Sequence, residues 1–147
     1  MKELIATIHG LGVFVIGRIT VFQDPFYTGI RPDLAVKKAD GQTVWKDHKG
    51  LSFIDVGSTE YWDHIVELSV DSYNLGFDEL NYDYIRYPSD GPMDNIAFTK
   101  SKSFPGDDMQ QANLETFFAY LNEKMSDESL FAEYKHTNTG RASSTPW

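Results

Sequence analysis

The 147-residue chain contains no cysteine, which excludes disulfide frameworks, thiolate metal sites and cysteine nucleophiles. No apolar run approaches the roughly 20 residues that cross a bilayer, and the N-terminus does not have the pattern of a signal peptide. The four histidines lack ligand spacing, and neither a glycine-rich phosphate loop nor a GxSxG elbow occurs. We therefore expect no metal, no cofactor and no membrane span, and the cellular location stays open.

Basic side chains are scarce as well. Thirteen lysines and arginines stand against 22 acidic residues, and the net charge is -9. A field of this sign repels phosphate backbones, so nucleic acid is not an expected partner. The content of 41% hydrophobic and 14% aromatic residues is that of a globular protein of about one domain.

Periodicity predicts helices alternating with buried strands. A helix is expected where apolar residues recur at helical spacing and a capping residue or glycine bounds the run, and a strand where β-branched residues run together. One predicted strand, VFVIGRITVF, is nearly continuously apolar, which is typical of a strand covered on both faces. The predicted helices are 2–9, 59–74 (capped by Ser58 or Thr59) and 112–125; the predicted strands are 13–22 and 78–86; Asp40-Gly41 predicts a hairpin.

This order is typical of an α/β protein with parallel strands. A complete eightfold barrel takes about 250 residues, so two strands amount to part of one. We therefore predict a partial (β/α)8 TIM barrel of about two to three βα units, with a small hairpin inserted in a βα loop. Residues 1–125 are assigned to this barrel domain. Residues 126–147 form a polar tail that we expect to be disordered or foreign to the fold.

Asp83 is the candidate catalytic residue. Side chains alternate along a strand, so Glu79, Asn81 and Asp83 share one face while Leu80, Tyr82 and Tyr84 share the other, which is expected to pack on helices. Asp83 then lies nearest the carboxyl end of its strand, where barrel enzymes keep their active sites. The alternative is a structural aspartate satisfied by Arg86 or by backbone groups.

Arg18 lies about as far along the first strand as Asp83 lies along the next. Because consecutive strands of this topology are usually neighbours, the two side chains are expected to pair. Such a guanidinium would hold Asp83 ionised, as a nucleophile requires. A purely structural ion pair is the alternative.

A carboxylate at the rim of a barrel is compatible with glycoside cleavage, which ordinarily needs two carboxyl groups, and a second one is not evident. Glu79 lies roughly 13 Å from Asp83 along the strand, too far to flank the same bond. Asp24 and Asp90 lie at the expected rim, although each is more typical of a turn or a helix cap. The expected supporting residues around Asp83 are Arg18, Asn81, Arg86, Asp24 and Asp90, with Tyr87 and Trp45 as aromatic sugar contacts.

Two blocks of sequence carry a family resemblance. VIGRITVFQDP followed by RPDLAV, and the long block from KGLSFIDVG to GFDELNYDYIRYPSDG, resemble the bacterial family called "Putative glycosyl hydrolase domain" over roughly residues 2–125. The resemblance implies a TIM barrel that acts on carbohydrate. It also matches Asp83 to the strand aspartate of the family motif, and Arg18 and Arg86 to its arginines.

Three functions are compatible with these observations. The first is a fragment of a glycoside hydrolase that acts on a carbohydrate polymer, with Asp83 as nucleophile or base and the general acid supplied from elsewhere. The second is a carbohydrate-binding barrel without catalysis, and the third is a truncated product with no activity of its own. For this chain alone we expect little activity and self-association through exposed sheet edges.

Overall fold

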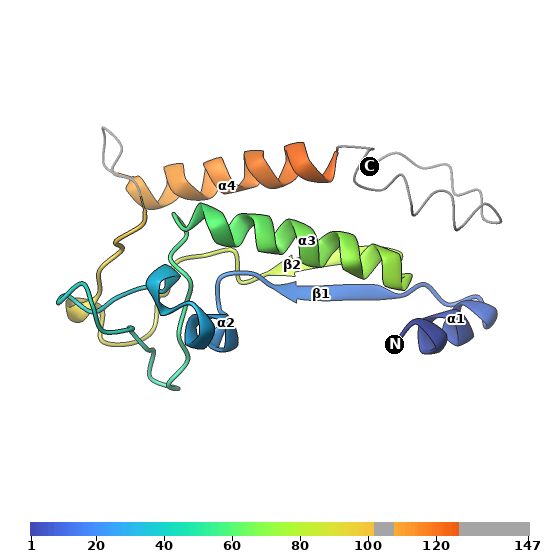
Figure 1. Ribbon diagram of the computed structural model, residues 1–147, viewed down its shortest axis with the longest axis horizontal. Coiled ribbons are helices and arrows are strands. Elements are labelled where there is room, and N and C mark those ends of the chain that lie inside the picture. Colours follow the sequence, from blue (N-terminus) through green and yellow to red (C-terminus); the bar gives the residue numbers. More distant parts are fainter. Residues whose placement is uncertain (102–107, 127–147) are drawn as a thin grey trace.

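The computed structural model describes residues 1–101 and 108–126. These residues form two strands and four α-helices, with two short 3-10 turns in the connecting loops (Figure 1). Every predicted helix and strand is present, with ends that differ by a few residues. The elements are α1 (Lys2–Gly10), β1 (Ile16–Thr20), α2 (Pro25–Ile30), η1 (Pro32–Leu34), α3 (Thr59–Leu75), β2 (Glu79–Asp83), η2 (Met93–Asn95) and α4 (Met109–Met125).

Strands β1 and β2 form a two-stranded parallel sheet, as the alternation of elements predicts. Arg18 lies opposite Asn81 and Thr20 opposite Asp83 in the register. Helix α3 runs along the strands, and α4 lies against α3 (Figure 1). The fold is therefore mixed α/β, with the carboxyl ends of both strands at the same end of the sheet.

The prediction that the first strand is covered on both faces is wrong for the described residues. Gly17 and Ile19 are buried against the core, whereas Ile16, Arg18 and Thr20 are exposed. Side chains alternate between the two faces of a strand, so this burial pattern means that α3 and its loops cover only one face of β1. Arg18 lies on the opposite, uncovered face, where it is accessible on the same side of the sheet as Asp83.

Helix α3 supplies the apolar layer under the sheet. Trp62, Ile65, Val66 and Ser69 are buried at helical spacing, as the pattern predicts. The predicted cap is only half right: Ser58 occupies the N-cap position, but its hydroxyl donates to the Leu34 carbonyl at 2.9 Å instead of capping the helix. The serine therefore ties the incoming loop to the helix start.

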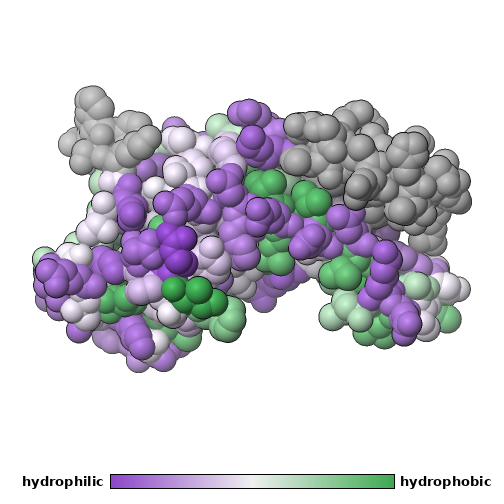
Figure 2. All heavy atoms as spheres, viewed as in Figure 1, coloured by the Kyte–Doolittle hydropathy of each residue, from purple (hydrophilic) through white to green (hydrophobic). Residues whose placement is uncertain are grey.

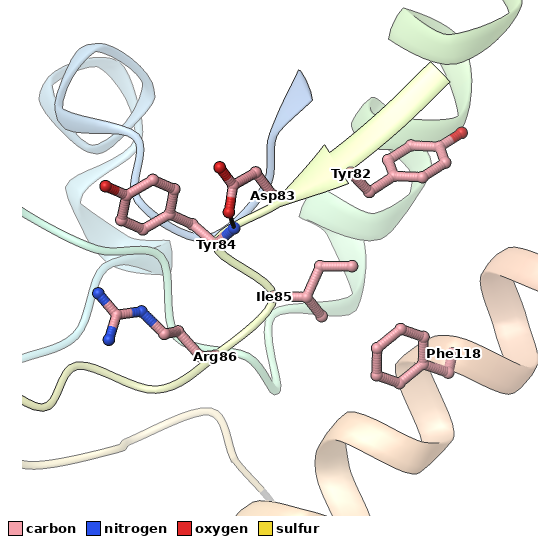
Figure 3. Close-up of a pocket in the computed structure, with 6 residues that line it drawn as sticks. All are labelled: Tyr82, Asp83, Tyr84, Ile85, Arg86 and Phe118. Carbon is pink, nitrogen blue, oxygen red and sulfur yellow. Dashed lines mark hydrogen bonds between the residues drawn. The ribbon is translucent and has the colours of Figure 1, made fainter. Parts of the chain in front are cut away.

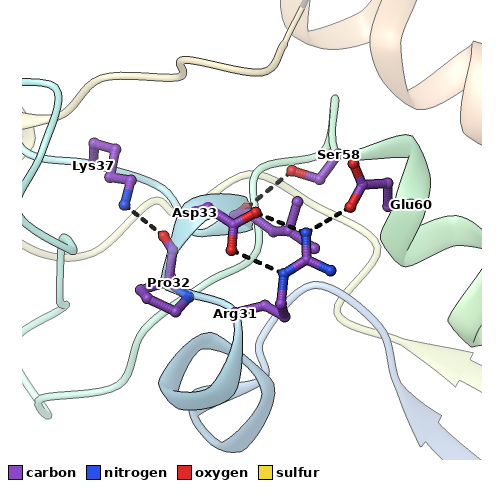
Figure 4. Close-up of polar contacts among 7 residues, drawn as sticks. Arg31, Pro32, Asp33, Lys37, Ser58 and Glu60 are labelled. Atoms are coloured by element: carbon purple, nitrogen blue, oxygen red, sulfur yellow. Dashed lines mark hydrogen bonds and ion pairs between the residues drawn. The ribbon is translucent and has the colours of Figure 1, made fainter.

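Arg31 fixes the same junction from the loop side. Its guanidinium donates to both oxygens of Asp33, at 2.9 and 2.7 Å, and to Glu60 in the first turn of α3 at 2.6 Å (Figure 4). The buried Lys37 ammonium donates to the Pro32 carbonyl in the same segment. These contacts hold the β1–α3 connection against the helix.

The predicted hairpin is present as a small antiparallel contact. Lys37 bridges Val44 across the Asp40-Gly41 turn. Beside it, Trp45 packs with Val36 and Phe53 in a second apolar cluster. The insertion therefore has a core of its own.

Asp55 is a fully buried carboxylate that ties two distant loops together. It accepts hydrogen bonds from the Gly57 amide (3.1 Å), the Lys100 amide (2.8 Å) and the Ser101 hydroxyl (2.6 Å). The single Ser101 hydroxyl proton goes to the carboxylate, so Tyr87 donates its own proton to Ser101, at 2.7 Å. A side chain at Gly57 would collide with the Lys100 backbone, because a Cβ there would lie 2.3 Å from its carbonyl oxygen.

Helix α4 packs on α3 through Phe117 and Leu121, which are buried. Phe118 follows Phe117 on the same helix, but its side chain is 50% exposed. Apart from Ser126, the tail predicted for 126–147 lies outside the described residues. No helix in the described part of the chain has the length and apolar character needed to cross a membrane.

Among the exposed large apolar side chains, two groups lie close together in sequence (Figure 2). One group surrounds α1 and the start of β1, and the other lies on α2. Neither strand has a second partner within the described residues. Self-association through these surfaces stays a prediction. The first group is Met1, Leu4, Leu11, Val13, Phe14 and Ile16; the second is Phe26 and Ile30.

Candidate functional site

Asp83 is the last residue of β2 and is held by two donors. One carboxylate oxygen accepts from the Tyr84 amide at 2.7 Å, and the other accepts from the Arg18 guanidinium. Its side chain is 37% exposed. The carboxylate is therefore fixed in orientation while remaining accessible at the carboxyl end of the strand (Figure 3).

The predicted Arg18–Asp83 ion pair is confirmed. Arg18 lies opposite Asn81, and its long side chain extends toward the carboxyl end of the sheet to reach Asp83, two residues further along β2. Both residues project from the uncovered face. The parallel register is what brings them together.

This pairing sets the charge state of Asp83. The hydrogen bond from Arg18 lowers the pKa of the Asp83 carboxyl below its ordinary value of 3.8, and the Tyr84 amide lowers it further. The same hydrogen bond raises the pKa of Arg18. At neutral pH Asp83 is therefore an anion, which suits a nucleophile or a general base and not a proton donor.

Replacing Arg18 with glutamine is expected to raise the pKa of Asp83 toward 3.8, because the main cause of the lowered value is removed. Carboxyl-carbon NMR titration of Asp83 measures this directly. In the parent protein the ion pair stabilises the folded state at pH values above the ordinary pKa of Asp83. This stabilisation is lost as the pH falls through the lowered pKa of the folded state. The variant should lose part of that pH dependence.

Arg31→Gln is the matched control, because Arg31 bonds to Asp33 and Glu60 and not to Asp83. It should leave the Asp83 titration unchanged. An unchanged pKa of Asp83 in Arg18→Gln would show that the ion pair does not control its ionisation.

The chain turns sharply after Asp83. Tyr84 has φ of 56°, in the left-handed region. Its side chain therefore does not share the face of Leu80 and Tyr82, and that prediction is wrong. Tyr84 lies on the Asp83 side of the chain, while Ile85 points toward the core (Figure 3). The Arg86 guanidinium carbon lies 5.3 Å from the centre of the Tyr84 ring.

These residues border a hollow of about 620 Å³ at the carboxyl end of β2. Asp83 is the one carboxyl group among the described residues that line it. Phe118, an exposed residue of α4, borders one side. The lining residues are Tyr82, Asp83, Tyr84, Ile85, Arg86 and Phe118.

The other predicted acids lie elsewhere. Asp24 caps α2 by accepting from the Tyr27 amide at 2.8 Å, and the Tyr61 hydroxyl lies 3.0 Å from its other oxygen. Asp90 is exposed and lies 3.7 Å from His48. Neither lines the hollow. Asn81 is exposed on the Asp83 face of β2.

The two aromatic residues predicted to contact sugar are buried. Trp45 is 0% exposed and donates its indole N–H to the Pro92 carbonyl at 3.2 Å, and Tyr87 is 6% exposed and bonded to Ser101. Their rings serve the core of the loops. Sequence reasoning missed Tyr84 and Phe118, because neither strand alternation nor helix periodicity places them at this hollow.

Within the described residues, no three His, Asp or Glu side chains gather closely enough to hold a metal ion. The chemistry that this site can offer comes from one anionic carboxylate, two guanidinium groups and an aromatic ring.

An accessible, ionised carboxylate at the carboxyl end of a parallel strand is an arrangement that sugar-cleaving α/β enzymes use. The chain belongs to the family described as "Putative glycosyl hydrolase domain", whose model matches residues 1–133. This confirms the family resemblance found in the sequence. No curated protein matches the chain.

Solved structures share the fold. A hypothetical protein from Ruminiclostridium thermocellum aligns with a TM-score of 0.71 and 28% identity, over 84% of this chain and 60% of that one. An α-galactosidase from Thermus thermophilus aligns with a TM-score of 0.60 and 18% identity, over 86% of this chain and 25% of that one. A GH31 α-xylosidase from a soil metagenome aligns with a TM-score of 0.56 and 17% identity, over 86% of this chain and 19% of that one.

The last two likenesses show the fold alone. The chain spans 60% of the length of the Ruminiclostridium protein and smaller parts of the other two.

Proposed function

We propose that the chain is part of a glycoside hydrolase that acts on a carbohydrate polymer, with Asp83 as nucleophile or general base. The observation that carries this proposal is the ionised Asp83, fixed by Arg18 and the Tyr84 amide yet open to the hollow. Family membership and the glycosidases among the similar structures support the reaction class.

The proposed architecture is part of a (β/α)8 barrel of about two to three βα units, formed by residues 1–125. A 17-residue helix comes after each parallel strand, α3 after β1 and its loop with α2, and α4 after β2, which supports this assignment. In such a barrel the uncovered face of the sheet is the inner one. Arg18, Asn81 and Asp83 would then project into the barrel, with Asp83 nearest its rim.

Two reaction courses are compatible with the site. As a nucleophile, Asp83 would attack the anomeric carbon while a general acid protonates the departing oxygen, and water would then release the sugar. As a general base, Asp83 would take a proton from the attacking water. The second carboxyl group would lie about 5 to 5.5 Å away in the first course and about 6.5 to 9.5 Å in the second.

A carbohydrate-binding barrel without catalysis is the second candidate. It is favoured by the observation that Asp83 is the single carboxyl group among the described residues lining the hollow. A binding protein needs the arginines and the aromatic ring but no second acid.

An assay of the full-length gene product separates the two candidates. The protein is incubated with a panel of β-glucan, xylan, mannan, galactan and starch, and both new reducing ends and retention by each polymer are measured. Hydrolysis of at least one polymer is expected. Retention without new reducing ends would favour the binding protein, and neither signal on any polymer would count against both.

A further inference from the structure

Tyr84 has the most unusual backbone conformation of the described residues. It is the one described residue other than glycine with positive φ. The left-handed region is strained for a bulky side chain, and such strain gathers at functional sites. The strain is locked in place, because the Asp83 and Tyr84 carbonyls accept from the Val21 and Phe22 amides at 2.8 and 3.3 Å.

The strained turn moves an aromatic ring from the core to the site. An extended chain would place Tyr84 beside Tyr82, whose hydroxyl donates to Ser69 of α3. Instead, Tyr82 and Ile85 pack against the core cluster and Tyr84 does not. Figure 3 shows the Tyr84 ring on the same side as Asp83 and Arg86.

Burial in the apolar core does not offset this cost, because Tyr84 lies outside both core clusters of the described residues. The ring is half-buried, it belongs to neither apolar cluster, and no hydrogen bond of its hydroxyl is present in the described part of the chain. The guanidinium of Arg86, an exposed side chain, lies over the ring, and Arg18 also interacts electrostatically with Tyr84. A ring that borders a hollow and is not part of the apolar core is suited to contact a ligand.

We propose that Tyr84 is a sugar-stacking residue, whose ring receives the apolar face of the sugar unit bound next to Asp83. This inference rests on the proposed function and names the residue that positions the substrate. A pyranose presents C–H groups on its faces and hydroxyls at its rim. The ring of Tyr84 would contact the C–H face of the sugar, and Arg86 and Asn81 can donate hydrogen bonds to its hydroxyls.

Binding is measured in an Asp83→Asn background of the full-length gene product, so that the probe is not cleaved. The probes are cellohexaose, xylohexaose, mannohexaose and maltohexaose, followed by calorimetry. Tyr84→Asn removes the ring but tolerates a left-handed backbone, and Tyr84→Phe keeps the ring. For the probe that binds, Tyr84→Asn should raise Kd at least about tenfold, the equivalent of 1.4 kcal/mol, and Tyr84→Phe should change it much less.

The melting temperature of Tyr84→Asn should not fall, because asparagine relieves the strain; this separates lost binding from lost folding. Unchanged Kd in Tyr84→Asn would overturn the stacking role while leaving hydrolysis by Asp83 intact. Equal losses in the Asn and Phe variants would overturn it too, since the hydroxyl and not the ring would then carry the binding. Binding of none of the four probes, in a protein that also cleaves no polymer, would overturn both proposals.

Discussion

Asp83→Asn is expected to reduce hydrolysis of the responsive polymer by about 10² to 10⁴-fold, the usual contribution of a positioned acid–base group or more. The amide keeps the size of the side chain but loses the negative charge that Arg18 and the Tyr84 amide hold in place. It can neither attack an anomeric carbon effectively nor accept a proton from water. Steady-state rates of reducing-end release give the loss in kcat.

Glu79→Gln is the matched control. Glu79 starts the same strand on the same face, but it lies roughly 13 Å away along the chain and does not line the hollow. The same loss of charge there should leave the rate nearly unchanged. Retained activity in Asp83→Asn would eliminate Asp83 as nucleophile or base.

Rescue by a small anion adds a test of the catalytic role. In Asp83→Gly, azide can enter the space of the lost carboxylate and attack an activated aryl glycoside, forming a glycosyl azide as the aryl oxygen departs. Recovery of turnover with azide would show that the loss lies in the missing group. Equal losses in Asp83→Asn and Glu79→Gln, without rescue, would instead indicate a damaged fold.

The Arg18–Asp83 pair could be predicted because it follows from regular geometry. Parallel neighbouring strands and side-chain alternation are enough to place two residues at similar depth on one face. The same regularities gave the order of helices and strands. They describe each element well as long as the chain stays extended or helical.

The rim of the site could not be predicted in this way, because it begins where the strand ends. The sign of φ at Tyr84 depends on hydrogen bonds to Val21 and Phe22, which are distant in sequence. Likewise, the burial of Trp45 follows from the packing of a loop insertion on Val36 and Phe53. Local sequence patterns do not contain these contacts, so they predict Trp45 and Tyr87 at the site, where the structure has Tyr84.

Asp55 shows the same limit, since its burial also arises from a contact between distant segments. Asp55→Ala is expected to destabilise the fold by about 3 to 5 kcal/mol, because two backbone amides and a hydroxyl lose a charged acceptor in a site without water access. The Lys100 amide and the Ser101 hydroxyl would be left without their acceptor, and Ser101 would no longer be oriented toward Tyr87. A lower urea midpoint in equilibrium unfolding measures the loss.

Asp40→Ala provides a control with the same number of hydrogen bonds. Asp40 accepts from two amides, those of Gln42 and Thr43, and from the Thr43 hydroxyl, but it lies exposed in the hairpin turn. Water can replace the lost acceptor there, so its urea midpoint should move far less. Similar shifts in both variants would mean that burial is not what makes Asp55 important. A large shift in Asp55→Ala alone would show that one buried carboxylate joins the two loops that border the carboxyl end of the sheet.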